Sequence, residues 1–328
     1  MKIGILTSGG DAPGMNAAIR AIVRKALYHD CQVYGIKRGY CGLLNGEIIP
    51  MNSRSVGDIL QRGGTILQSA RCPEFSTPEG QEKAKEQLSN LGLNGLIVIG
   101  GDGSFRGAQV INKMGFQTVG IPATIDNDIA CTDFSIGFDT AVNTVLDAMN
   151  KIRDTAFSHN RVYVVEVMGK TSGFIAVAAG LTGGAEAILI PEVSFDLDEI
   201  CSQLKRSAQS GKAHSIILVA EGLNGDPKDV EKSSGFIVGD YIRNHTGCDT
   251  RITVLGHIQR GGMPTFFDRQ LGTLMGAKAV DLLLKGATEK MVGFTGNRIQ
   301  VFDINNAIKT KKTIDYSELE LAHVMAGL

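Results

Sequence analysis

The chain has 328 residues, 43% of them hydrophobic, and a formal net charge of −1. A chain of this length is usually too long for one hydrophobic core, so about two domains are expected. The apolar content excludes a wholly disordered chain. The near-neutral charge gives no general attraction to nucleic acid or to an anionic membrane.

Targeting signals and cysteine motifs are absent from the sequence. The apolar start, 3–6, is too short for a signal peptide, and no apolar run reaches the roughly 20 residues of a membrane span. The six cysteines lack the close spacing of a zinc or redox motif. We therefore expect reduced thiols in a cytoplasmic protein that binds neither nucleic acid nor membrane.

Short β-branched apolar runs alternate with longer amphipathic stretches, which is typical of parallel sheets with crossover helices. The predicted strands are Lys2–Thr7, Val33–Lys37, Gly95–Ile99, Thr118–Ile121, Val162–Val167, Ala187–Ile190, Ser215–Val219 and Arg251–Leu255. The predicted helices are Ala17–Leu27, Glu79–Leu91, Phe105–Met114, Thr140–Ala156, Gly173–Leu181, Leu197–Ser210 and Gly272–Leu284. Polar or glycine-rich segments follow most strands, and ligands of such sheets bind beyond the carboxyl ends of the strands.

The first such segment is Ser8–Asn16, which joins the first strand to a helix. Backbone N–H groups at a helix start attract phosphate, and glycines let the phosphate approach closely. The loop has neither the Gly-Lys-Ser/Thr of a Walker A motif nor the Gly-x-Gly-x-x-Gly of a dinucleotide-dependent oxidoreductase. The alternative is a tight turn whose glycines serve geometry alone.

The second segment, Gly100–Ser104, places Asp102 among small residues after an apolar strand. One carboxylate in such a loop suits a magnesium ion that arrives on the phosphates of a nucleotide. The alternative is that Asp102 caps the helix predicted to begin near Ser104.

The third segment, Pro122–Asp128, carries Asp126 and Asp128 at the end of another strand. One carboxylate can accept the proton of an attacking hydroxyl while the other orients it or helps to hold the metal. The alternative is a turn rich in Asp and Asn. Basic side chains that could grip a sugar phosphate also lie at strand ends, namely Arg71, Arg161, Lys170, Arg251, His257 and Arg260.

With these residues assembled, the chain resembles bacterial ATP-dependent 6-phosphofructokinases from its N-terminus to about residue 290. The stretches that carry the resemblance are Thr7–Arg20, Gly63–Phe75, Val98–Ser104, Thr124–Asp128, Lys151–Thr155, Val164–Gly169 and Val254–Gly262. The resemblance implies two doubly wound three-layer αβα domains with mainly parallel sheets and an active site in the cleft between them. Residues 1–138 with about 264–312 would bind ATP, and residues 139–263 with about 313–328 would bind fructose 6-phosphate.

The implied reaction transfers the γ-phosphoryl group of Mg-ATP to the 1-hydroxyl of fructose 6-phosphate, the committed step of glycolysis. Asp126 would be the general base, with Thr124, Asp128 and Lys170 beside it, and Asp102 would be tied to Mg²⁺. The implied ATP contacts are Gly10, Tyr40, Arg71, Cys72, Gly101, Asp102, Gly103 and Ser104. The implied fructose 6-phosphate contacts are Thr124, Ile125, Asp126, Arg161, Met168, Gly169, Lys170, Glu221, Arg251, His257, Ile258, Gln259 and Arg260.

The resemblance also implies assembly and regulation. Arg161 and Arg251 match positions that reach the site from a neighbouring subunit, and the family is usually tetrameric. A second site would bind the effectors ADP or phosphoenolpyruvate. Its matching positions are Arg20, Arg24, Arg54, Asp58, Arg153, Gly184, Glu186, Lys212 and His214, and Ser53 and Ser210 stand where basic residues are often found.

Three features of the sequence bear on this interpretation. Pyrophosphate-dependent relatives carry Asp where Gly103 stands and Lys where Ala123 stands, so the small residues here favour ATP. The pyrophosphate-dependent version of the reaction is the closest alternative. Lys170 replaces the usual Arg and loses its bidentate fork, which leaves open a more distant alternative, a catalytically weakened nucleotide sensor on the same fold. An apparent insertion lies between Glu221 and Arg251, in 224–234 or the helix after it.

Overall fold

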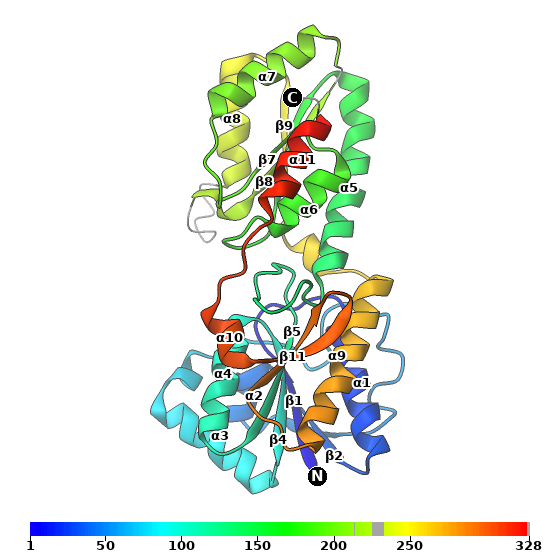
Figure 1. Cartoon of the computed structure of the whole chain (residues 1–328), viewed down its shortest axis with the longest axis vertical. Coiled ribbons are helices and arrows are strands. Elements are labelled where there is room, and N and C mark those ends of the chain that lie inside the picture. Colours follow the sequence, from blue (N-terminus) through cyan, green and yellow to red (C-terminus); the bar gives the residue numbers. More distant parts are fainter. Residues whose placement is uncertain (213, 225–232, 327–328) are drawn as a thin grey trace. The chain divides into compact units, whose positions relative to one another are not determined.

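The structure is a computed structural model that describes residues 1–212, 214–224 and 233–326 (Figure 1). It divides into two compact units, Met1–Thr140 with Arg260–Lys312 and Ala141–Gln259 with Thr313–Leu328. Residues 225–232, in which the insertion was suspected, lie outside the described part. Mixed α/β units with largely parallel sheets confirm the predicted fold class.

The first unit is built on a seven-stranded sheet in the order β11-β10-β5-β4-β1-β2-β3. Its two edge strands, β3 and β11, run antiparallel to their neighbours, and the other pairs are parallel. The strands are β1 (Lys2–Thr7), β2 (Gln32–Ile36), β3 (Ile48–Met51), β4 (Gly95–Gly100), β5 (Gln117–Pro122), β10 (Lys290–Thr295) and β11 (Arg298–Asp303).

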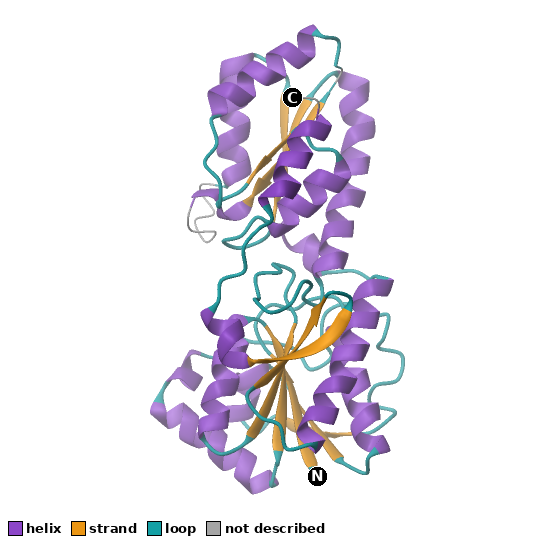
Figure 2. Ribbon diagram, viewed as in Figure 1, coloured by secondary structure: helices purple, strands orange, loops and turns teal. Residues whose placement is uncertain are grey.

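Helices cover both faces of this sheet (Figure 2). The helices are α1 (Met15–Tyr28), α2 (Gly39–Leu44), α3 (Pro78–Leu91), α4 (Asp102–Lys113), α9 (Phe266–Leu284) and α10 (Ile304–Lys309), with a short 3-10 helix, η1 (Pro73–Ser76). On one face α1 packs against α9, and on the other α2, α3, α4 and α10 bury a core that includes Leu43, Leu88 and Phe105. The sheet is thus the middle of three layers.

The second unit has a four-stranded parallel sheet in the order β7-β8-β6-β9. Its core on one face joins the strands to α7 and α8 through Ile200, Leu204 and Ile242, while α6 and α11 pack on β7. The strands are β6 (Val162–Val167), β7 (Ala187–Leu189), β8 (Ser215–Ala220) and β9 (Thr250–Val254). The helices are α5 (Phe138–His159), which begins in the first unit, α6 (Phe174–Gly183), α7 (Leu197–Gln209), α8 (Ser234–Thr246) and α11 (Tyr316–Ala326), with 3-10 helices η2 (Glu221–Asn224) and η4 (Gly256–Arg260).

The helix starts differ in how their first N–H groups are satisfied. Side chains cap α3, α7 and α9, where Thr77, Asp196 and Thr265 accept hydrogen bonds from the first turn. In contrast, α1 and α4 begin at Gly14 and Gly101, which have no side chain to offer. Both starts follow strands of the first sheet and lie at its carboxyl edge, where the positive end of a helix favours an anion, although the Met15 N–H already donates to the Ala12 carbonyl at 3.2 Å.

Candidate functional site

The loop after β1 lies directly beside the loop after β4. The Ser8 N–H donates to the Ile99 carbonyl at 3.0 Å, and a Cβ added to Gly100 would lie 2.4 Å from the Ser8 carbonyl oxygen. Gly10 has equally little room, because an added Cβ would lie 2.4 Å from Nη1 of Arg260. That guanidinium donates to the Asp11 carbonyl at 3.2 Å. The structure therefore brings Gly10 and Arg260 together, although they are 250 positions apart.

Asp102 is the first residue of α4, and its carboxylate does not cap that helix. Gly101 is the N-cap residue, in an extended conformation, so the alternative that Asp102 caps a helix near Ser104 is wrong. The Asp102 side chain is 44% exposed and accepts a hydrogen bond from Nε of Arg106 at 3.0 Å. A Cβ added to Gly103 would meet nothing within 4 Å, which shows open space beside the carboxylate.

The Asp126 turn follows β5, which pairs in parallel with β4 so that Gly100 lies opposite Pro122. The Ala123 N–H donates to the Gly100 carbonyl at 3.0 Å, and a Cβ on Gly101 would lie 3.9 Å from Cβ of Thr124. The segments that carry Asp102 and Asp126 therefore lie at the ends of adjacent strands. Asp126 is only 7% exposed, which favours a carboxylate with a specific local role over a solvated turn residue.

Side chains that the sequence analysis did not select hold this turn. Asn127 has a φ of +52° and lies between the two carboxylates; its Nδ2 donates to the Asp133 carbonyl at 3.0 Å, and its Oδ1 accepts from the Ser135 N–H at 2.9 Å. Oγ of Ser135 donates to the Thr124 carbonyl at 2.7 Å. Asn is among the residues that tolerate a left-handed conformation, and this property could have pointed to Asn127.

Tyr40 is buried against the first turn of α4. Its hydroxyl donates to the Ser104 carbonyl at 2.7 Å, its ring stacks on Phe75 at 4.3 Å, and it is 5% exposed. Burial raises the pKa of the Tyr40 phenol, which keeps it a neutral donor. Cys72 immediately precedes η1, and burial raises the pKa of its thiol. Arg71 is exposed in the same loop, just after Ser69, whose Oγ donates to the Gly9 carbonyl at 2.6 Å.

In the second unit, Met168–Lys170, Glu221 and His257–Gln259 follow β6, β8 and β9, whereas Arg161 precedes β6 and Arg251 lies within β9. Oε1 of Glu221, after β8, accepts hydrogen bonds from the Lys170 N–H at 2.7 Å and the Gly169 N–H at 3.3 Å. The Met168 N–H donates to Oε1 of Gln259 at 3.3 Å, and that side chain is fully buried. Glu221 and Gln259 thus shape the turn that carries Lys170, whose φ is +58°. His257 and Ile258 are exposed in η4.

Arg161 and Arg251 share one carboxylate, that of Asp249. Nε of Arg161 lies 2.6 Å from Oδ2 of Asp249, and Nη2 of Arg251 lies 3.3 Å from the same carboxylate. The hydrogen bond from Arg161 holds the pKa of Asp249 below its ordinary value. Asp249 was missed from sequence, because only the parallel pairing of β6 with β9 makes it the neighbour of Arg161.

The residues expected to bind effectors fall into two groups. Arg20, Arg24, Arg54 and Asp58 belong to the first unit and the remainder to the second. In the second group, Glu186 is 7% exposed and pairs with Lys212 at 3.0 Å, and Nη2 of Arg153 donates to the Gly184 carbonyl at 3.3 Å. His214 contacts Phe157 edge-on.

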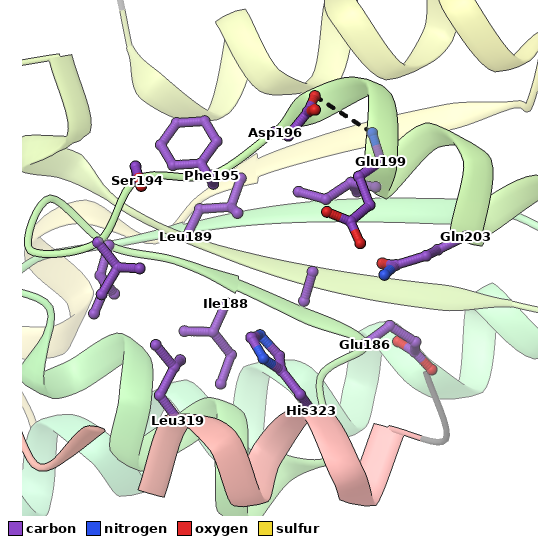
Figure 3. A pocket seen from close by; sticks show the side chains of 14 residues that line it. Glu186, Ile188, Leu189, Ser194, Phe195, Asp196, Glu199, Gln203, Leu319 and His323 are labelled. Carbon is purple, nitrogen blue, oxygen red and sulfur yellow. Dashed lines mark hydrogen bonds between the residues drawn. The ribbon is translucent and has the colours of Figure 1, made fainter. Parts of the chain in front are cut away.

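A cavity of about 380 Å³ lies in the second unit beside the edge strand β7. Figure 3 shows Glu199 and Gln203 of α7 facing Leu319 and His323 of α11 across it. Of the expected effector residues only Glu186 lines this cavity, and none of its fourteen lining residues, all in the described part of the chain, is Lys or Arg. A phosphorylated ligand therefore has little to recognise there.

The described residues contain neither a cluster suited to a metal ion nor a helix suited to a membrane. No group of three or more His, Cys, Asp or Glu side chains among them could hold a metal ion. Within the same residues, every helix is too short or too polar to cross a bilayer.

Comparisons with known proteins agree on one family. The phosphofructokinase family model matches residues 2–283. The chain is 55% identical to an "ATP-dependent 6-phosphofructokinase" of Halothermothrix orenii over 99% of each chain, and 55% identical to the Bacillus subtilis protein of the same name over 98% of each.

Solved structures extend this likeness. The phosphofructokinase from Saccharomyces cerevisiae is 34% identical with a TM-score of 0.86, and it matches over 99% of this chain; this chain spans about half (48%) of the yeast chain. A pyrophosphate-dependent phosphofructokinase from Nitrosospira multiformis also has a TM-score of 0.86, covering 96% of this chain and 86% of its own. It is only 20% identical, so its likeness shows the fold alone.

Proposed function

The chain belongs to the phosphofructokinase family, and from this premise we propose that it is an ATP-dependent 6-phosphofructokinase. It transfers the γ-phosphoryl group of ATP to the 1-hydroxyl of fructose 6-phosphate and yields fructose 1,6-bisphosphate and ADP. The observation that carries this function is the convergence of the Gly10, Asp102 and Asp126 loops at the ends of the adjacent strands β1, β4 and β5. Phosphoryl transfer requires such positioning of donor, metal and base around one reacting centre.

ATP is favoured over pyrophosphate as the phosphoryl donor. The relatives that share 55% identity are named as ATP-dependent, whereas the pyrophosphate-dependent structure shares 20%. Open space at Gly103 leaves room beside Asp102 for a nucleotide. A carboxylate at Gly103 would place a charge in that space, and a lysine in place of Ala123, which is 1% exposed, would add a charge at a buried position.

Asp126 serves as the general base of a direct in-line transfer. Its buried turn is fixed by Asn127 and Ser135, which orients the carboxylate towards the attacking hydroxyl without large reorganisation. Two hydrogen bonds fix Thr124 in this turn. Its carbonyl accepts from Oγ of Ser135, and its hydroxyl accepts from the Asp126 N–H at 3.2 Å. Asp128 and Lys170 complete the catalytic set.

The Asp102 loop fits a Mg²⁺ ion that enters with ATP. A half-exposed carboxylate beside open space can contribute one ligand, and magnesium usually takes few protein ligands and keeps several waters. When bound, the ion neutralises charge on the phosphates. The uncapped N–H groups of α1 and α4 add positive potential at the same edge, towards the phosphates that Gly10 and Gly101 to Ser104 contact.

The second unit supplies most of the fructose 6-phosphate site. Glu221 and Gln259 hold the Met168–Lys170 turn, and His257, two residues before Gln259, is exposed. Arg161 and Arg251 serve the site of a neighbouring subunit in a homotetramer, and the ion pairs of both with Asp249 fix their orientation. The nine residues named above as effector positions bind ADP or phosphoenolpyruvate between subunits. The enzyme works in the cytoplasm.

A coupled assay with fructose 6-phosphate and either ATP or pyrophosphate tests the donor, the acceptor and the base. Wild type turns over with ATP, and Asp126→Asn lowers kcat by about 100-fold or more, since general-base catalysis contributes on that order. Asp147→Asn, an exposed carboxylate paired with Lys151 on α5, is the matched control and keeps wild-type kcat. Turnover with pyrophosphate alone, or full activity of Asp126→Asn, contradicts the proposal.

A further inference from the structure

Lys312 is the last residue of the first unit, and the chain enters the second unit at Thr313. Its Nζ donates to the Asp133 carbonyl oxygen at 2.8 Å. The same oxygen accepts a hydrogen bond from Nδ2 of Asn127 at 3.0 Å. One carbonyl thus joins the crossing segment of the chain to the turn between Asp126 and Asp128.

Further contacts fix both ends of this link. Ile129 and Lys311 form an antiparallel backbone bridge, which holds the crossing segment against the chain that follows Asp128. Asp133 is anchored on β10, since its N–H donates to the Phe294 carbonyl at 2.8 Å and its Oδ2 accepts from the Gly296 N–H at 2.9 Å. The Asp133 carbonyl therefore has a defined position relative to the sheet.

The ammonium of Lys312 is also the local counter-charge. The charged groups that face it are the carboxylates of Asp133 and Asp128. Burial lowers the pKa of Lys312 to about 8, and the two carboxylates oppose that shift. A partly buried ammonium costs stability unless its partners offset the cost, and here the carboxylates of Asp133 and Asp128 provide that offset beside the turn.

We propose that Lys312 is a positioning residue for phosphoryl transfer, which holds the Asp126–Asp128 turn in its reactive geometry through Asp133 and Asn127. This inference rests on the proposed function, because it acts through the base Asp126. Lys312 is not a catalytic residue in the sense of touching substrate. Its loss would let the turn rotate away from the attacking hydroxyl, and small misplacements of a base slow turnover more than they weaken substrate binding.

The test compares Lys312→Met, Lys312→Arg and the control Lys311→Met, an exposed neighbour whose bridge uses only its backbone. We expect Lys312→Met to lower kcat by about 10-fold while KM for both substrates changes by less than about threefold. Lys312→Arg restores most of the loss because it keeps the charge and a donor, and Lys311→Met behaves as wild type. Urea unfolding of each variant verifies that its fold is intact.

A second measurement applies if Lys312→Met does not fold. Arginine stays protonated at a higher pH than this lysine, so the alkaline limb of the kcat–pH profile moves upward in Lys312→Arg. Unchanged kcat in a folded Lys312→Met, or superimposable pH profiles of wild type and Lys312→Arg, overturns the inference. Inactivity of wild type with ATP instead overturns the proposed function, so the two failures are distinguishable.

Discussion

Lys170 sits in a turn whose backbone is held independently of its side chain. The Lys170 N–H is fixed by Glu221, and the left-handed φ of +58° would cost an arginine as much as a lysine. A change of this residue to arginine therefore alters the head group alone. This makes the position suitable for testing how much a guanidinium would add to the site.

We predict that Lys170→Arg raises kcat severalfold, because a planar fork can bind two oxygens of the transferring phosphoryl group where an ammonium acts as a point charge. Steady-state kinetics with ATP and fructose 6-phosphate measures this. Lys205→Arg, an exposed change of the same kind on α7, is the control and leaves kcat unaltered. A fall in turnover for Lys170→Arg would show that the site is adapted to lysine.

The position of a loop could be predicted from sequence where a strong apolar strand precedes it. The loops of Asp102 and Asp126 each follow such a strand, and the parallel pairing of β4 and β5 puts both strand ends at one edge. The supports Arg106 and Asp249 were not selected, because their partners become neighbours only through helix spacing or strand pairing. Asn127 offered one signal, the tolerance of asparagine for a left-handed backbone.

At the scale of elements, one buried carboxylate secures the start of the long helix α5. Asp268 is fully buried in α9, and it accepts hydrogen bonds from the Gly137 N–H at 2.7 Å and the Thr140 N–H at 2.8 Å. Thr140 lies in the first turn of α5 and Gly137 directly precedes that helix, so Asp268 caps the start of α5 from another element. Burial raises the pKa of Asp268 to about 6, against hydrogen bonds from Thr140 and Gly137 that lower it.

We predict that Asp268→Asn lowers the free energy of unfolding by about 1–3 kcal/mol at neutral pH, since an amide nitrogen cannot accept from the Thr140 N–H. The deficit is larger at pH 5 than at pH 7. The pKa of Asp268 is 3.8 in the unfolded chain and about 6 in the folded protein, so between these values the folded wild type keeps a proton that the unfolded chain has released. This extra proton stabilises the folded wild type at low pH, and the stabilisation is lost as pH rises through about 6. Urea unfolding at both values measures it.

The matched control for this prediction is Asp281→Asn, which removes a half-exposed carboxylate of α9 paired with Lys25. It should cost less than about 1 kcal/mol, as surface ion pairs do. A deficit of Asp268→Asn that grows with pH would contradict the burial argument and indicate that the hydrogen bonds to the carboxylate dominate.

Strong apolar runs predicted their elements well, and weak patterns did not. The bounds of β1 and β6 match the predicted Lys2–Thr7 and Val162–Val167, whereas β3, β10, β11, α2, α10 and α11 were not predicted. β3 is short, carries Pro50 and lies at a sheet edge, where burial imposes little pattern. β11 is largely exposed and pairs with β10 through a hairpin at Gly296 and Asn297, which hydrophobic periodicity does not reveal.

At the scale of the whole molecule, the proposed chemistry is divided between two units that each hold their own sheet and core. The base and metal loops belong to the first unit, while Arg161 and Arg251 belong to the second, on the edge strand β9 or beside it. An edge strand leaves one side free of intrachain pairing, which is compatible with a subunit contact there. If these arginines serve a neighbour's site, activity depends on two different chains.

Hybrid assemblies test this division directly. One chain carries Asp126→Asn, and the other carries both Arg161→Ala and Arg251→Ala, so each alone is nearly inactive. In random mixed oligomers about a quarter of the sites combine an intact Asp126 with intact arginines from the neighbour, and activity should recover to about that fraction of wild type. Hybrids that form, as mass spectrometry can verify, yet stay inactive would show that each chain completes its own site.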